Sequence, residues 1–134
     1  MPLPSSQHGA TSDRDEVRLR RLAKLGVLEI TSDDGHHTLV LTGELDIASS
    51  WLLEHPLLKI RADGVQSFTL DLSGLTFIDS TGIRAVLAAS GLCATRGCEF
   101  MVIPGPGQVQ RVFEFAGLID RLPFSNRDAV VAKT

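Results

Sequence analysis

Strand-like and helix-like segments alternate along this chain, and this alternation limits its fold more than any other feature of the sequence. Runs of β-branched and large apolar residues predict four short strands, over residues 27–30, 38–42, 68–72 and 99–103. Apolar residues at helical spacing predict four helices, over residues 47–62, 81–95, 108–116 and 127–132. Strands that alternate with helices form βαβ units around a largely parallel sheet. We therefore predict an α/β domain whose four- to five-stranded, mostly parallel or mixed sheet has helices packed against it.

Two local signals modify this pattern. The cluster Ser-Asp-Asp-Gly at 32–35 is typical of a turn, so the two strands beside it are expected to form an antiparallel hairpin at one edge of the sheet. In the first predicted helix, Pro56 supplies no backbone N–H and is expected to kink or restart the helix.

The first 25 residues differ in charge from the rest of the 134-residue chain. They carry five basic and three acidic residues, a net charge of +2, whereas the remainder carries 8 basic and 13 acidic residues, a net charge of −5. We predict a flexible basic N-terminal extension over residues 1–25 and a single domain over residues 26–134. Within the extension, the spacing of Val17, Leu22 and Leu25 suggests a short amphipathic helix over residues 13–25, either a partner-binding arm or a solvated lead-in.

Composition excludes several classes of function. No run of about 18 apolar residues is present, so no membrane-spanning helix is predicted, and the first ten residues lack the pattern of a signal peptide. Two cysteines are too few for a disulfide framework, so we expect a cytoplasmic protein with reduced thiols. A net charge of −3 and 5% aromatic residues argue against nucleic-acid binding. Neither the adjacent His36 and His37 nor the pair Cys93 and Cys98 matches a metal motif, so we expect no metal and no cofactor.

The segment Asp79-Ser80-Thr81-Gly82 leads from an apolar run into the predicted helix over residues 81–95. Asp79 or Ser80 can cap that helix, because their side-chain oxygens accept hydrogen bonds from the free N–H groups of the first turn. A hydroxyl at this point is presented on a rigid element. The helix dipole and the free N–H groups there also favour an anion, so a phosphate on Ser80 is compatible with the helix.

Three motifs resemble those of the STAS-domain anti-sigma factor antagonists, the SpoIIAA-like family. Asp-Ser-Thr-Gly at 79–82 resembles the phosphorylation loop of the family, and Gly-Glu-Leu-Asp at 43–46 resembles its motif after the second strand. Residues 109–118 resemble a later helix motif of the family that ends in Gly-Leu. The motifs occur in the family's order, and the resemblance covers residues 27–131.

The resemblance implies a single STAS domain that acts as a protein switch and catalyses no reaction. In this family the unphosphorylated antagonist binds an anti-sigma factor, which is also its serine kinase, and thereby frees a sigma factor. Phosphorylation releases the kinase, and a phosphatase, of the PP2C type, reverses the modification. By motif position Ser80 is the phospho-acceptor, with the adjacent Thr81 as second choice. The residues implied in partner binding are Glu44, Asp46, Asp79, Ser80, Thr81 and Gly82. Of these, Asp46 and Asp79 are expected to lie near the acceptor, where they contact the partner or orient the hydroxyl. Pro56 departs from the family pattern beside this surface. Trp51, one turn earlier, is either an exposed partner anchor or half-buried packing.

Three alternatives are open on the sequence alone. A serine enzyme would use Ser80 as nucleophile, but no histidine has a spacing that demands a catalytic triad and no G-x-S-x-G motif occurs. A nucleotide-sensing module would use the glycines of Pro-Gly-Pro-Gly at 104–107, which lack the lysine of a P-loop. A third alternative keeps the STAS fold in a signalling pathway that does not control a sigma factor directly. The oligomeric state is also open.

Overall fold

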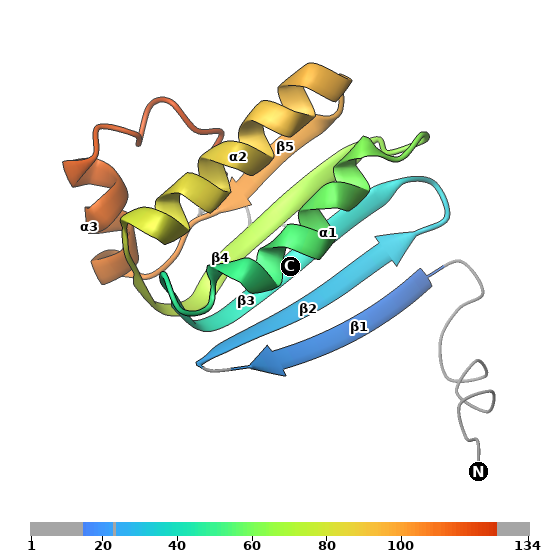
Figure 1. Ribbon diagram of the computed structural model, residues 1–134. Coiled ribbons are helices and arrows are strands. Elements are labelled where there is room, and N and C mark those ends of the chain that lie inside the picture. Colours follow the sequence, from blue (N-terminus) through green and yellow to red (C-terminus); the bar gives the residue numbers. More distant parts are fainter. Residues whose placement is uncertain (1–14, 23, 126–134) are drawn as a thin grey trace, which may run out of the picture.

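The computed structural model describes residues 15–22 and 24–125, which build one five-stranded sheet (Figure 1). Its strands lie in chain order across the sheet: β1 (Asp15–Leu22), β2 (Leu25–Ser32), β3 (His36–Leu45), β4 (Ser67–Ile78) and β5 (Glu99–Ile103). β1, β2 and β3 pair antiparallel, and β3, β4 and β5 pair parallel. The predicted α/β class with a mixed sheet is therefore confirmed, as is the antiparallel hairpin, formed by β2 and β3.

Helices α1 (Glu54–Leu58) and α2 (Ser80–Arg96) cover one face of this sheet, and α3 (Gly107–Phe115) contacts β4 near its end (Figure 1). The helices predicted over residues 81–95 and 108–116 are α2 and α3. Alternate strand residues point towards the helices: Leu39 on β3 pairs with Leu70 on β4, and both are buried. Burial of such apolar area is the main stabilising term for a domain of this size.

The helix predicted over residues 13–25 is wrong, because residues 15–22 form β1. Every residue of β1 has a Cα partner on β2, whereas an isolated helix of this length is marginal in water. Val17 and Leu19 are 50% and 66% exposed, so these apolar residues do not form the buried stripe of an amphipathic helix. Part of the expected 1–25 extension is therefore a strand of the sheet, and residues 1–14 lie outside the described residues.

The continuous helix predicted over residues 47–62 is also wrong. The chain first makes a turn, then a 3-10 helix, η2 (Ser50–Leu53), then α1, and finally a second 3-10 helix, η3 (Lys59–Arg61). Pro56 is the third residue of α1, where its missing N–H has no acceptor to lose. The helical segment thus restarts just before Pro56, as predicted. The helix predicted over residues 127–132 lies outside the described residues.

Candidate functional site at the start of helix α2

Ser80 is the first residue of α2 and its side chain is exposed. Asp79, just before it, is in an extended conformation and caps the helix: its Oδ1 accepts a hydrogen bond from the Gly82 N–H at 3.0 Å. In the described part of the chain the Ser80 hydroxyl makes no hydrogen bond of its own. The sequence allowed either Asp79 or Ser80 to cap the helix, and in the structure Asp79 is the cap.

Asp79 also joins the two motifs that carry the predicted site. Its Oδ2 accepts a hydrogen bond from the Ile47 N–H at 3.2 Å, and its own N–H donates to the Leu45 carbonyl at 3.2 Å. A single carboxylate thus fixes the first turn of α2 to the loop that follows β3. The structure brings Asp79 and the Gly-Glu-Leu-Asp motif into one unit although more than 30 residues separate Asp79 from Ile47 along the chain.

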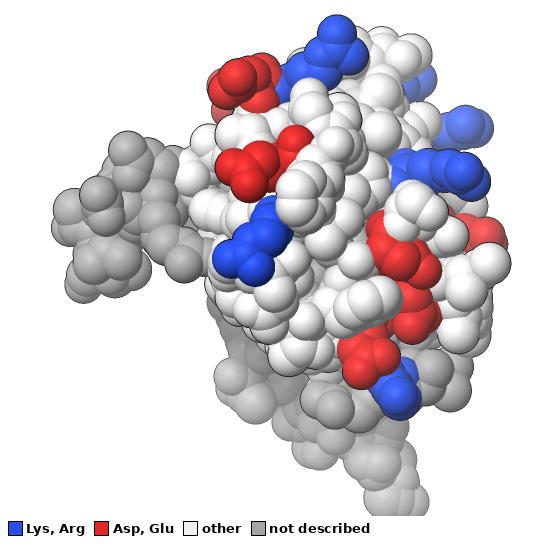
Figure 2. Space-filling view, turned by 90° about the vertical axis from the view of Figure 1, so that its left-hand side faces the viewer, with Lys and Arg blue, Asp and Glu red and all other residues white. Residues whose placement is uncertain are grey.

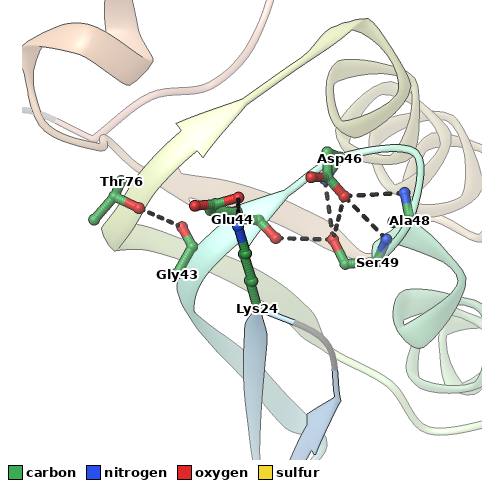
Figure 3. A network of polar contacts seen from close by, with 7 residues as sticks. All are labelled: Lys24, Gly43, Glu44, Asp46, Ala48, Ser49 and Thr76. Carbon is green, nitrogen blue, oxygen red and sulfur yellow. Dashed lines mark hydrogen bonds and ion pairs between the residues drawn. The ribbon is translucent and has the colours of Figure 1, made fainter.

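Asp46 holds the loop after β3 in shape (Figure 3). Its Oδ1 accepts hydrogen bonds from the Ala48 N–H at 2.9 Å, the Ser49 N–H at 3.1 Å and the Ser49 hydroxyl at 3.2 Å. Ser49 is 1% exposed, and its hydroxyl also donates to the Glu44 carbonyl at 2.8 Å. Each of these bonds lies between residues 44 and 49, so the structure gives Asp46 a structural role in the loop and no bond to Ser80.

Two glycines of the motifs allow close contacts of the backbone around Ser80. Gly43 has a φ of +93°, and a Cβ there would lie 2.0 Å from the Lys24 carbonyl oxygen. A Cβ on Gly82 would lie 2.7 Å from the Leu45 carbonyl oxygen and 2.7 Å from Ile78 Cγ1. Both distances are too short for any larger residue. Gly82 is therefore required to bring the first turn of α2 against the end of β3.

Acidic side chains are grouped on this end of the molecule (Figure 2). Glu44, Asp46 and Asp79 are half-buried there, and Lys24 lies beside Glu44 with Nζ 3.8 Å from the Glu44 carboxylate. The Lys24 side chain is 75% exposed, so this long ion pair contributes little to stability. Three carboxylates thus lie near Ser80, together with the positive charges of Lys24 and Arg84 and the positive end of the α2 dipole.

Two exposed apolar side chains extend from the loop that Asp46 and Asp79 hold. Ile47 is 76% exposed and Trp51 is 51% exposed, and the Trp51 indole N–H donates to the Ala48 carbonyl at 3.1 Å. The sequence left Trp51 open between a partner anchor and half-buried packing. Sequence reasoning missed Ile47, whose only signal is a large apolar residue directly after the Gly-Glu-Leu-Asp motif. It also missed Arg84, an exposed residue one helical turn after Ser80.

The third motif and the glycine turn before it have structural roles. Val109 and Phe113 on α3 are fully buried, and Gly117, at a φ of +74°, ends that helix. A Cβ on Gly105 would lie 2.7 Å from Val109 Cγ1, and the Gly105 N–H donates to Gln110 Oε1 at 2.9 Å. The turn thus packs against α3, which removes the main support for a phosphate-binding loop.

His36 and His37 do not assemble a catalytic or metal centre with Ser80. His36 Nδ1 lies 2.7 Å from the Ser67 hydroxyl, and the His37 ring stacks on Phe68, both at the start of β3 and far from its end at Leu45. Among the described residues no group of three His, Cys, Asp or Glu side chains is arranged to hold a metal ion. In the same part of the chain, no helix has the length and apolar character needed to cross a membrane.

Comparison with known proteins gives consistent matches. Residues 27–129 match the family model of the STAS domain. The anti-sigma-B factor antagonist of Staphylococcus aureus (strain NCTC 8325 / PS 47) is 27% identical over 93 residues, which cover 69% of this chain and 86% of that protein. The anti-sigma-B factor antagonist of Staphylococcus epidermidis is 26% identical over 96 residues, 72% of this chain and 88% of that protein.

Solved structures show the same fold. The anti-sigma factor antagonist SpoIIAA in its unphosphorylated form has a TM-score of 0.60 at 18% identity, covering 88% of this chain and 95% of SpoIIAA. An anti-sigma factor antagonist from Mycobacterium paratuberculosis has a TM-score of 0.62 at 22% identity, covering 91% and 96%. The family model spans well over half of the sequence, and both motifs at the candidate site lie within it. The chain therefore belongs to the STAS domain family.

Proposed function

We propose that this protein is an anti-sigma factor antagonist, a binding module switched by phosphorylation of Ser80. Unphosphorylated, it sequesters an anti-sigma factor that is also its serine kinase; phosphorylated, it releases that partner. The observation that carries the proposal is the exposed, unbonded Ser80 hydroxyl at the start of α2, capped by Asp79. The names of the two staphylococcal relatives support it independently.

The physical basis of the switch is charge. A phosphate adds about −1.5 to −2 charge at pH 7. The dipole and free N–H groups of α2 accommodate that charge locally, so the fold survives the modification. Glu44, Asp46 and Asp79 already make this surface acidic. A bound partner would enclose the phosphate together with these carboxylates. Like charges brought together at an interface cost several kcal/mol, and each 1.4 kcal/mol is about tenfold in affinity.

The proposed partner surface consists of the loop after β3 and the first turn of α2. Its polar members are Glu44, Asp46, Asp79, Ser80 and Thr81, with Gly82 providing the close backbone contact. Ile47 and Trp51 add exposed apolar area, and such residues at the centre of an interface contribute most of the binding energy. A phosphatase of the PP2C type would remove the phosphate from Ser80 and restore binding. We propose that this cycle takes place in the cytoplasm. The protein itself catalyses no reaction.

The test is affinity capture from the cells that encode this protein, with wild type and Ser80→Ala as baits, followed by phosphosite mapping of the wild type. We expect both baits to capture the same ATP-dependent serine kinase, and that kinase to phosphorylate Ser80. Thr81→Ala is the matched control, because it removes a neighbouring hydroxyl and leaves the acceptor. Phosphate on another residue, with Ser80 unmodified, would contradict the proposal. A captured kinase that binds no sigma factor would assign the module to a different signalling pathway.

A further inference from the structure

Among the described residues, β1 pairs with β2 alone, so no strand lies along its outer edge. β1 is the first strand in the spatial order, and it forms the blue margin of the sheet in Figure 1. It is eight residues long, and its apolar residues Val17 and Leu19 are half or more exposed. A long edge strand with exposed apolar residues is a template for pairing with another strand, because its outward N–H and C=O groups have no partner.

The remaining segments of this chain are poor candidates to cover that edge. Residues 1–14 contain Pro2, Pro4 and Gly9, and proline lacks the N–H that a strand partner needs. The C-terminal segment leaves the described structure at Ser125, whose N–H donates to the Val102 carbonyl on β5 at 2.8 Å. β5 lies at the opposite edge of the sheet from β1. None of the described strands pairs with this edge of β1, so a second molecule is the source of a partner strand that we consider.

The charge sequence of β1 is self-complementary in the antiparallel direction. Asp15 and Glu16 begin the strand, and Arg18, Arg20 and Arg21 follow. Two copies that pair antiparallel about Arg18 bring Asp15 opposite Arg21 and Glu16 opposite Arg20, each twice because of the two-fold symmetry. Opposite charges directly across a pair of strands stabilise it. In the same register Val17 lies opposite Leu19, so the exposed apolar residues cover each other.

Other registers are less favourable. Residues opposite each other must lie on the same face of the sheet. The two-fold axis of a symmetric antiparallel pair can therefore be centred only on a residue, and the alternatives to Arg18 are its neighbours. Centring the pair on Leu19 brings Arg18 opposite Arg20, and centring it on Val17 leaves one type of opposite-charge pair, Glu16 with Arg18. A parallel, in-register pair would bring every charged residue opposite its own copy. The arrangement about Arg18 has the most opposite-charge pairs.

The one repulsive contact in that arrangement is Arg18 against its own copy. Glu29 is the partner of Arg18 across the β1–β2 pair, so each copy also contributes a carboxylate one strand away. Glu29 is 2% exposed; its Oε1 lies 2.7 Å from Lys59 Nζ, and among the described residues its Oε2 has no hydrogen-bond partner. The Glu29 carboxylate is already paired with Lys59, so the opposite-charge pairs on either side of Arg18 must outweigh the repulsion between its two copies.

We infer that β1 is a self-association edge through which two copies of this chain form a symmetric dimer with one continuous ten-stranded sheet. The partner is a second copy, recognised by the acidic-to-basic order of residues 15–21. The inference does not rest on the proposed function, because neither Ser80 nor the loop after β3 belongs to β1. Its failure would leave the phosphorylation switch untouched.

The test is charge reversal of each half of the strand, measured by sedimentation equilibrium of the full chain. The variant Asp15→Arg/Glu16→Arg makes the strand wholly basic, and Arg20→Glu/Arg21→Glu makes all but Arg18 acidic. We expect the wild type to dimerise with increasing concentration and each variant to dimerise about tenfold or more weakly. An equimolar mixture of the two variants restores all four opposite-charge pairs, so it is expected to form the heterodimer. Arg111→Glu/Arg121→Glu is the control, because it removes two exposed positive charges away from β1.

Circular dichroism of each variant establishes that it is folded, and the mixture separates a lost interface from a lost fold, because only folded variants regain a dimer together. Slower hydrogen exchange of β1 amides at high wild-type concentration is the second expected result. A wild type that remains monomeric up to millimolar concentration would overturn the inference. So would a dimer that both variants retain unchanged, since that dimer would use another surface.

Discussion

The carboxylate of Asp79 binds the backbone of Ile47: one oxygen caps α2 through the Gly82 N–H, and the other accepts the Ile47 N–H at 3.2 Å. Through this contact Ser80, the proposed phospho-acceptor, and the exposed apolar loop after β3 belong to one surface. A phosphate on Ser80 would therefore lie directly beside the loop that we propose to contact the partner.

Replacing Asp79 with Ala is expected to destabilise the protein by about 0.5–2 kcal/mol, the usual contribution of a helix N-cap. The Ile47 N–H also loses its acceptor, so hydrogen exchange at Ile47 should become faster. Urea unfolding gives the free energy, and exchange measured by NMR gives the local effect. Asp63→Ala is the control, because the fully exposed Asp63 side chain makes only a long ion pair with Arg96, at 3.6 Å, which contributes little to stability. Equal stability of the two variants would show that Asp79 is not a structural cap.

Gly82 and Gly91 lie in the same helix, but replacing each with alanine is expected to change the free energy of unfolding in opposite directions. A Cβ on Gly82 would lie 2.7 Å from the Leu45 carbonyl oxygen, so Gly82→Ala is expected to cost about 1–3 kcal/mol of unfolding free energy. A Cβ on Gly91 would meet no atom within 4 Å, so Gly91→Ala should stabilise by up to about 1 kcal/mol. Chemical unfolding of both variants measures the difference. A stabilising Gly82→Ala would contradict the close contact between α2 and β3.

His37 makes stability depend on pH. Its burial lowers its pKa below 6.5, as does the positive charge of Lys59, while Glu29 acts in the opposite direction and His36 adds a further lowering effect. The unfolded chain therefore binds a proton at His37 more readily than the folded protein, so this residue costs stability as pH falls below 6.5 and has no effect above it. The His37→Gln variant should lose less stability between pH 7 and pH 5 than the wild type.

The pH experiment has a control in His55, an exposed residue of α1. His55→Gln should show the same dependence on pH as the wild type, measured by the midpoint of urea unfolding at each pH. If His37→Gln and the wild type lose equal stability on acidification, the environment of His37 is not what makes the fold acid-sensitive.

The two cysteines should differ in reactivity. Burial raises the pKa of the Cys93 thiol to about 12, and a hydrogen bond with the side chain of Cys98 acts in the same direction. The thiolate is the nucleophile, so Cys93 should be inert to iodoacetamide at pH 8 in the folded protein. Cys98 is only partly buried and should be alkylated first. Peptide mapping after timed labelling measures both rates, and in urea the two should converge. Faster labelling of Cys93 in the native protein would contradict its burial.

The regular part of the fold followed from the sequence, because each predicted strand or helix carries its own period of apolar residues. The helix over residues 81–95 is α2 to within a residue at each end, since Asp79 and Gly97 supply the cap and the stop. The segment 15–22 was misread because Val17, Leu22 and Leu25 fit a helical spacing, while the pairing with β2 that decides its structure is not local. Tertiary contacts also decide where the segment after β3 is helical.

The candidate site was predicted in part. Motif position pointed to Ser80, but nothing local indicates that Asp79 reaches the Ile47 N–H, a contact 32 residues away along the chain. Asp46 was expected near the acceptor, yet its Oδ1 is used within its own loop, a bonding pattern that depends on the buried Ser49. The exposure of Ile47 follows from the shape of that loop and is not encoded in any periodic pattern.

The most direct test of the switch is the affinity of the captured kinase for wild type, Ser80→Glu and Thr81→Glu, measured by isothermal titration with the unfolding temperature of each variant alongside. A carboxylate at the first position of α2 suits the helix dipole, so Ser80→Glu should keep the stability of the wild type within about 1 kcal/mol. It should nevertheless bind the kinase about tenfold or more weakly than the wild type. Thr81→Glu adds the same charge one residue away and should weaken binding less. Equal affinity of Ser80→Glu and wild type would contradict the account.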